Sequence, residues 1–162
     1  MKKSQNKTKR PKVVAISGGF DPVHIGHINL IRAARRLGGR LVVILNNDNW
    51  LKKKKGFVFM NESERKAVLE AFKYVDGVLV TSHSDDPADM SICRELELLK
   101  PDIFANGGDR DKKDADNRAS SLNPEQKLCA KLGIKMIFGV GGKKQQSSSE
   151  LVRRVKESGH VA

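Results

Sequence analysis

Two histidines, His24 and His27, stand at the start of a predicted helix, directly after a short apolar run and a glycine turn. The run, residues 13–16, predicts a buried strand, and Gly18-Gly19 predicts the turn after it. A strand, a turn and a helix N-terminus often bind phosphate, because free backbone N–H groups and the positive end of the helix dipole face the ligand. A spacing of three residues places both imidazoles on one face of the first helical turn. The segment therefore predicts a triphosphate site, with a loop-capping pair or a metal site as the open alternatives.

A second predicted helix start also has the chemistry of an anion site. Residues 141–149 read GGKKQQSSS and lead into a helix expected over 149–157. Hydroxyls and backbone N–H groups at a helix N-terminus can hold an anion, and this cradle would face the first. Ordinary capping by Ser148 or Ser149 is the alternative, and one serine could do both.

Apolar segments of strand type alternate with segments of helical periodicity along the chain. The expected strands cover residues 13–16, 40–45, 77–81, 102–105 and 135–140. Helices are expected over 28–37, 62–72, 89–99 and 149–157, with another opening at Asn123-Pro124-Glu125. This alternation predicts one α/β domain, a doubly wound five-stranded parallel sheet with helices on both faces. The polar and glycine-rich segments after most strands should meet at the carboxyl edge, where such sheets bind ligands.

Length and charge set the domain limits. The chain has 162 residues and a formal net charge of +12, and residues 1–12 contain six basic and no acidic residues. We expect a disordered basic tail over 1–12, one domain over 13–157 and a short tail over 158–162. One tryptophan and one tyrosine provide no base-stacking platform, so nucleic acid is not the expected partner. Two distant cysteines and the lack of a long apolar run fit a reducing cytoplasm and no membrane span.

The segment GGFDPVHIGH, residues 18–27, resembles the HxGH signature of the cytidylyltransferase-like nucleotidyltransferases, which have a Rossmann-like fold. The resemblance implies that His24 and His27 contact the triphosphate and stabilise charge as the α-phosphorus is attacked. Gly26 lies between them and leaves room for a nucleotide near the backbone. The remaining nucleotide-binding residues implied for this turn are Gly18, Gly19, Phe20 and Asp21.

The lysine run in residues 46–56 resembles a loop of the heptose-phosphate adenylyltransferases whose lysines approach the triphosphate and the acceptor phosphate. Lys52 and Lys55 are the matching positions, implied to be catalytic. An ammonium group can neutralise charge on a departing pyrophosphate. Adjacent lysines leave the register open by one residue, and Lys53 and Lys54 read as part of a solvated loop.

Residues 61–65, NESER, resemble the helix start at which that family places an arginine on the acceptor side of the site. The resemblance assigns this role to Arg65. A surface arginine paired with a residue four positions away is the alternative. Asn61 and Glu64 also have the spacing of a capping box.

Residues 101–109, PDIFANGGD, resemble the family's glycine-aspartate turn after a strand. Gly108 would let the backbone meet the nucleotide, and Asp109 would orient the ribose or support the phosphate site. A plain strand-to-turn connection is the alternative.

The serines of the second anion cradle resemble a family motif that clasps the β- and γ-phosphates. This assigns nucleotide binding to Ser147, Ser148 and Ser149. Lys143 and Lys144 stand where several relatives carry an arginine, and they are the candidates for binding phosphate or acceptor.

The resemblance implies transfer of a nucleoside monophosphate from an NTP to a phosphorylated acceptor, with release of pyrophosphate. ATP is favoured as donor and CTP stays open, while the motifs favour a sugar or polyol phosphate as acceptor. Mg²⁺ would bind mainly through the NTP phosphates, since no protein metal motif is visible. Adenylyltransferases of the nicotinate-mononucleotide or pantetheine-phosphate type are the runner-up. A non-catalytic nucleotide- or nucleic-acid-binding protein is the alternative of another class, and the resemblance also allows a homodimer.

Overall fold

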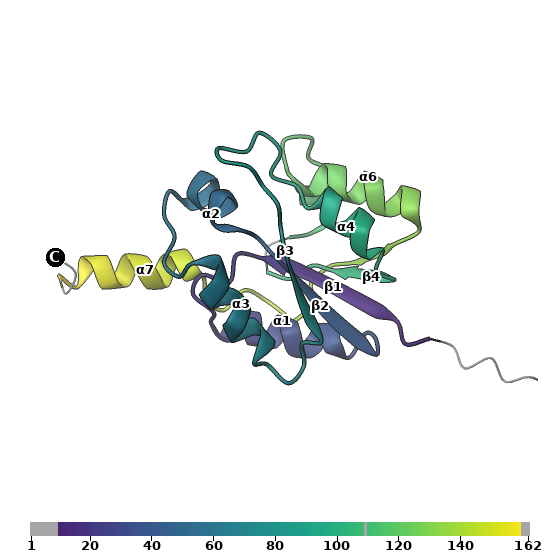
Figure 1. The fold of residues 1–162 in the computed structure, drawn as a ribbon, viewed down its shortest axis with the longest axis horizontal. Coiled ribbons are helices and arrows are strands. Elements are labelled where there is room, and N and C mark those ends of the chain that lie inside the picture. Colours follow the sequence, from purple (N-terminus) through teal and green to yellow (C-terminus); the bar gives the residue numbers. More distant parts are fainter. Residues whose placement is uncertain (1–9, 109, 160–162) are drawn as a thin grey trace, which may run out of the picture.

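Five parallel strands form one sheet in the order β3-β2-β1-β4-β5 in the computed structural model, which describes residues 10–108 and 110–159. The strands are β1 (Val13–Gly18), β2 (Arg40–Leu45), β3 (Gly77–Val80), β4 (Ile103–Ala105) and β5 (Lys135–Ile137). The chain builds outward from β1 to β3, then crosses back to β4 and β5 (Figure 1). The strand order therefore reverses between β1 and β4, the position at which doubly wound sheets bind ligands.

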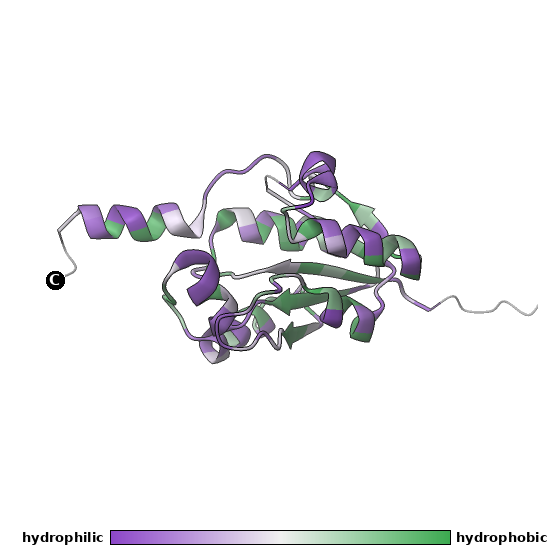
Figure 2. Ribbon diagram, turned by 90° about the horizontal axis from the view of Figure 1, so that it is seen from above, coloured by the Kyte–Doolittle hydropathy of each residue, from purple (hydrophilic) through white to green (hydrophobic). Residues whose placement is uncertain are grey.

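Helices cover both faces of the sheet, as predicted, because alternate strand residues point to opposite sides. On one face, Val14 and Ile16 pack with α1 (Ile25–Arg35) and α3 (Glu62–Glu70). On the other, Ala15 and Phe104 pack with α4 (Cys93–Leu99) and α6 (Leu122–Leu132). Figure 2 shows the apolar strands between helices whose outer surfaces are polar. The predicted α/β class and Rossmann-like sheet are confirmed.

The lysine run lies in a helix, and the expectation of a loop there is wrong. Helix α2 (Asp48–Lys55) begins after Asn47, whose side chain accepts a hydrogen bond from the Trp50 backbone N at 3.0 Å. It ends at Gly56, whose φ of 78° is in the left-handed region that favours glycine. Trp50 and Leu51 are buried, so tertiary packing of two apolar side chains stabilises a helix that lysines otherwise dominate.

Several boundaries differ from those expected. Helix α4 begins at Cys93, because residues 86–92 form a segment with its own polar contacts, such as Trp50 Nε1 to the Met90 carbonyl at 2.9 Å. Strand β5 ends at Ile137 and is followed by Gly139 with a φ of 68°. A short helix, α5 (Lys112–Asp116), was not expected.

The N-terminal end of the described chain contacts the sheet region, whereas the C-terminal helix extends away from it. Residues 1–9 and 160–162, parts of the two expected tails, lie outside the described residues. Arg10 forms two hydrogen bonds of 2.8 Å to Asp102, so contacts with the domain begin before residue 13. Helix α7 (Ser148–Glu157) extends away from the sheet (Figures 1 and 2). Within the described ranges, no helix is long and apolar enough to cross a membrane.

Candidate active site

A cleft of about 370 Å³ opens at the carboxyl edge of the sheet, where the strand order reverses. Its walls are the start of α1, the segment after β4, residues 140–149 after β5, and the last residue of α2. The predicted site residues that line it are His24, Gly26, His27, Lys55, Gly108, Lys143, Lys144, Ser147, Ser148 and Ser149. Asp109 lies outside the described residues. Lining residues that the sequence did not single out for the site include Ser17, Leu30, Asn106, Arg110, Gln145 and Gln146.

The two histidines bind the backbone at the start of α1. The Gly26 N–H donates to His24 Nδ1 at 3.1 Å, and the His24 N–H donates to His27 Nδ1 at 3.3 Å. The rings stack with centroids 3.8 Å apart. Because each Nδ1 accepts a hydrogen bond, a neutral ring carries its proton on Nε2 and keeps that N–H as a donor. The capping alternative is therefore observed, and it leaves the other edge of each ring for a ligand.

The electrostatic environment keeps both histidines neutral. Burial, with smaller contributions from His24 and Lys55, lowers the pKa of His27 to about 3. Burial also lowers the pKa of His24, followed by the positive charges of Lys55 and Lys144. A triphosphate would bring negative charge into this surplus of positive charge, so it would be attracted to the site.

Lys55, at the end of α2, is the lysine of the run that reaches the cleft. Burial lowers the pKa of its ammonium group, and this effect exceeds the opposing effect of the Asp21 carboxylate. Lys52 is exposed and does not line the cleft. Lys53 pairs with Asp86 at 2.6 Å. Of the two matching lysines, the structure places only Lys55 with the histidines.

The serines connect the N-terminus of α7 to the histidine segment. Ser147 is the N-cap, and its hydroxyl accepts a hydrogen bond from the Glu150 N–H at 3.2 Å. The Ser148 hydroxyl donates to the Pro22 carbonyl at 2.9 Å, two residues before His24. The capping role falls on Ser147, one residue before the serines expected for it. These contacts bring the N-termini of α1 and α7 to one cleft.

Gly18, Gly19 and Phe20, in the turn before the histidines, do not line the cleft. The Phe20 ring is buried, with its centroid 4.7 Å from that of His27. A Cβ on Gly18 would lie 3.1 Å from the Phe20 ring, and one on Gly19 would lie 2.7 Å from Leu51. The structure shows close packing at these three residues, and Phe20 packs against the ring of His27.

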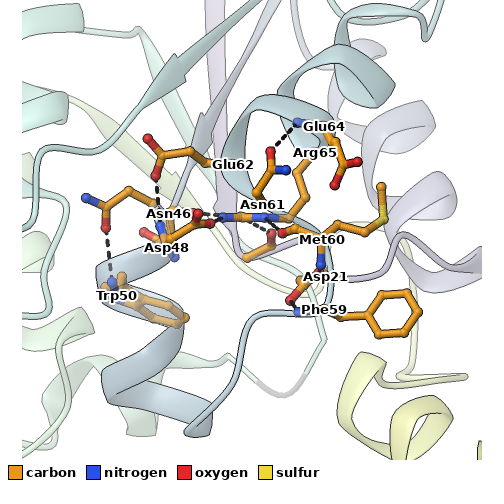
Figure 3. A network of polar contacts seen from close by, with 12 residues as sticks. Asp21, Asn46, Asp48, Trp50, Phe59, Met60, Asn61, Glu62, Glu64 and Arg65 are labelled. Carbon is orange, nitrogen blue, oxygen red and sulfur yellow. Dashed lines mark hydrogen bonds and ion pairs between the residues drawn. The ribbon is translucent and has the colours of Figure 1, made fainter. Parts of the chain in front are cut away.

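Asp21 and Arg65 are fully buried and organise the loops beside the cleft (Figure 3). The Asp21 carboxylate accepts hydrogen bonds from the Phe59 and Met60 N–H groups, both at 2.7 Å. Arg65 donates to the carbonyls of Met60, Gly19 and Asn46 at 2.7–2.8 Å and to the Asp48 carboxylate at 2.6 Å. Neither residue lines the cleft. Both residues hold loops in position beside the cleft, and the alternative of a surface Arg65 is wrong.

Comparisons with known proteins found a family model, relatives and solved structures that are similar to this chain. The model of the cytidylyltransferase-like family matches residues 15–155. An FAD synthase from Pyrococcus abyssi is 39% identical over 99 residues, which are 60% of this chain and 64% of the relative. The bifunctional protein HldE from Hahella chejuensis is 43% identical over 103 residues, 62% of this chain and 20% of the relative. The chain thus matches less than two thirds of the length of either relative.

Similarity to a solved structure concerns the fold. The crystal structure of the lipopolysaccharide core biosynthesis protein from Thermoplasma volcanium GSS1 matches with a TM-score of 0.58 and 24% sequence identity. The match covers 85% of this chain and 98% of that chain. The same arrangement of strands and helices therefore extends over most of the domain.

Proposed function

The chain belongs to the cytidylyltransferase-like family, and from this premise we propose that it is a nucleotidyltransferase acting on a phosphorylated small molecule. One observation carries the proposal: two neutral imidazoles lie in the cleft with their Nδ1 atoms occupied by backbone N–H groups. Their Nε2–H groups are donors suited to phosphate oxygens. Lys55, Lys143 and Lys144 line the same cleft and supply positive charge.

In the proposed reaction, an oxygen of the acceptor phosphate attacks the α-phosphorus of the NTP. A new P–O bond forms, the bond from the α-phosphorus to the bridging oxygen breaks, and pyrophosphate leaves with the electron pair. The attacking oxygen is already anionic, so the site needs no strong general base. Catalysis then consists of positioning and charge stabilisation, with His24 and His27 donating hydrogen bonds and Lys55 neutralising developing charge.

We propose Mg²⁺ as the cofactor, held mainly by NTP phosphate oxygens and water. In residues 10–108 and 110–159, no group of three or more His, Cys, Asp or Glu side chains is arranged to hold a metal ion. The cleft does offer serine hydroxyls beside its lysines. A magnesium ion keeps several waters and commonly bridges substrate phosphates, which this donor set accommodates. When bound, it would neutralise charge on the β- and γ-phosphates.

ATP is the proposed donor and a sugar or polyol phosphate the proposed acceptor. FAD, the product in the name of one relative, is AMP joined to FMN, and the phosphates of the two halves form its diphosphate. The FMN phosphate is carried on a ribityl chain, so FMN is a polyol phosphate. The FAD synthase relative therefore supports transfer of AMP to a phosphate on a polyhydroxylated carbon chain.

The test is pyrophosphate release with Mg²⁺, with ATP and CTP each combined with a panel of acceptors. The panel contains FMN, heptose 1-phosphate, glycerol 3-phosphate, nicotinate mononucleotide and phosphopantetheine. We expect turnover with ATP and one of the first three acceptors. Turnover only with one of the last two would support the runner-up class. Nucleotide binding without turnover on any pair would contradict the acceptor class and favour a binding protein.

A further inference from the structure

A buried carboxylate, that of Glu125 in α6, lies next to Arg110, a residue of the cleft wall. Glu125 is only 1% exposed. Its Oε1 accepts a hydrogen bond from the Ile92 N–H at 3.1 Å, just before α4 begins. Its Oε2 lies 3.6 Å from Nη1 of Arg110, a residue that lines the cleft after β4. Glu125 of α6 thus contacts both the start of α4 and a side chain that lines the cleft.

Packing alone does not account for an acidic residue at this position. Burial raises the pKa of Glu125 to about 7, although the Arg110 charge opposes this effect. Asp89 and Asp114 raise it further. A buried ion pair is commonly no more stabilising than apolar side chains of the same volume that replace both partners. The Ile92 N–H gives one oxygen of Glu125 a structural partner. The other oxygen has no hydrogen-bond partner among the described residues and faces Arg110, so the cleft side of the pair calls for another explanation.

One nitrogen of the Arg110 guanidinium is buried, while the rest of the side chain is partly exposed. Nη1 is buried and has no hydrogen-bond partner, although it faces Glu125. The side chain as a whole is 34% exposed and borders the cleft. This arrangement restrains the orientation of the guanidinium while leaving part of it accessible to a ligand.

The chemistry of the surrounding wall indicates what Arg110 would hold. Strands β4 and β5 are neighbours, so Arg110 after β4 lies on the same side of β1 as Lys143 and Lys144 after β5. The N-terminus of α7 borders the same cleft and favours anions. A planar guanidinium presents paired N–H groups that match two oxygens of a phosphate.

We propose that Arg110 binds a phosphate oxygen of the nucleoside triphosphate and that Glu125 is the positioning residue that orients it. The proposal rests on the proposed function, and it adds a binding residue and its support to the nucleotide side of the cleft.

Calorimetric binding of ATP and of inorganic tripolyphosphate, which has no nucleoside, tests the contact. Arg110→Gln should weaken both ligands by about 10-fold or more, the effect expected for a charge-assisted hydrogen bond. Arg110→Lys keeps the charge without the paired geometry and should be intermediate. Arg118→Gln is the matched control, because Arg118 is exposed and does not line the cleft. This variant should bind both ligands as tightly as the wild type does.

The role of Glu125 is tested by Glu125→Gln, which keeps an oxygen able to accept from the Ile92 N–H but removes the charge facing Arg110. We expect several-fold weaker binding of both ligands, and no further weakening when the substitution is added to Arg110→Gln. That non-additivity is the signature of one residue acting through the other. Equal weakening in both backgrounds would contradict the positioning role.

The outcomes separate this inference from the proposed function. Failure of the wild type to bind ATP would contradict the proposed function itself. A wild type that binds and turns over ATP, with Arg110→Gln unchanged, would overturn only the inference. Weaker ATP binding with unchanged tripolyphosphate binding would place the contact on the nucleoside and also overturn it. Thermal unfolding checks each variant, and Arg110→Lys decides the question if Arg110→Gln does not fold.

Discussion

At the scale of single residues, His24 and His27 combine a structural and a chemical role. Each imidazole binds a backbone N–H through Nδ1, which fixes the ring and leaves the Nε2–H as a donor. The same bonds favour the neutral ring, because protonation would place a hydrogen on Nδ1. The cleft therefore presents two oriented neutral donors among positive lysines.

His24→Asn separates these two roles. Asparagine caps helices well, so the fold should persist, but it cannot reproduce the Nε2 donor. We expect turnover to fall by about 10²-fold with thermal stability close to that of the wild type. His83→Asn is the matched control, since His83 lies outside the cleft and its ring contacts Thr81 and the Ser91 carbonyl. Near-normal turnover of His24→Asn would contradict the assigned role.

The low pKa of His27 predicts acid sensitivity of the free protein. The folded-state pKa of about 3 lies below the ordinary value of 6.5, so the unfolded chain binds the proton first as the pH falls. Stability should therefore decline from about pH 6.5 towards pH 3, at no more than about 1.4 kcal/mol per pH unit for this one proton. Urea unfolding at pH 7.5, 6 and 5 should show a shallower decline for His27→Asn. The same slope in both proteins would exclude His27 as the source.

At the scale of elements, α2 carries the lysine run and selects which lysine acts. Its buried Trp50 and Leu51 fix the helix against the body. The helical rotation then places Lys55 in the cleft while Lys54 remains exposed. Of the four adjacent lysines, Lys55 therefore lines the cleft and the other three lie on the surface.

Lys55→Gln should therefore lower turnover by about 10-fold or more, because an ammonium group beside the phosphates is lost. Lys54→Gln removes the same charge from the exposed side of the same helix and should change turnover less than two-fold. Steady-state kinetics at two salt concentrations distinguish a local contact from a general charge effect. Equal losses in the two variants would indicate the latter.

At the scale of the whole molecule, Arg65 of α3 binds the segments that follow β1 and β2, the start of α2 and the segment before α3, and so forms one frame beside the cleft (Figure 3). Three of its acceptors are backbone carbonyls, those of Met60, Gly19 and Asn46. The frame fixes the positions of short loops at the sheet edge.

Arg65→Lys should lower the free energy of unfolding by about 3 kcal/mol, because an ammonium group cannot replace four directed hydrogen bonds. Urea unfolding measures this loss. Arg36→Lys, at an exposed arginine, should stay within about 0.5 kcal/mol of the wild type. A selective rise in the acceptor KM at unchanged stability would instead indicate direct contact between Arg65 and the acceptor.

The sequence by itself determined the features that depend on local pattern. Alternating apolar strands and periodic helices predicted the doubly wound sheet, because each pattern follows from the repeat of its own element. The histidine spacing at a helix start predicted that His24 and His27 share a site, because three residues are nearly one helical turn. Clustering of the segments after β4 and β5 with that helix start followed from parallel strands alone.

Only the tertiary structure decided which side chains reach the cleft. Arg65 is buried by partners up to 46 residues away, and Ser148 contacts a carbonyl 126 residues away. Lys55 and Lys52 have the same chemistry and differ only in the direction in which α2 presents them. The Glu125–Arg110 pair likewise brings a buried helix residue to a residue of the cleft wall. Such outcomes depend on contacts between distant segments, and no local pattern encodes burial that other parts of the chain provide.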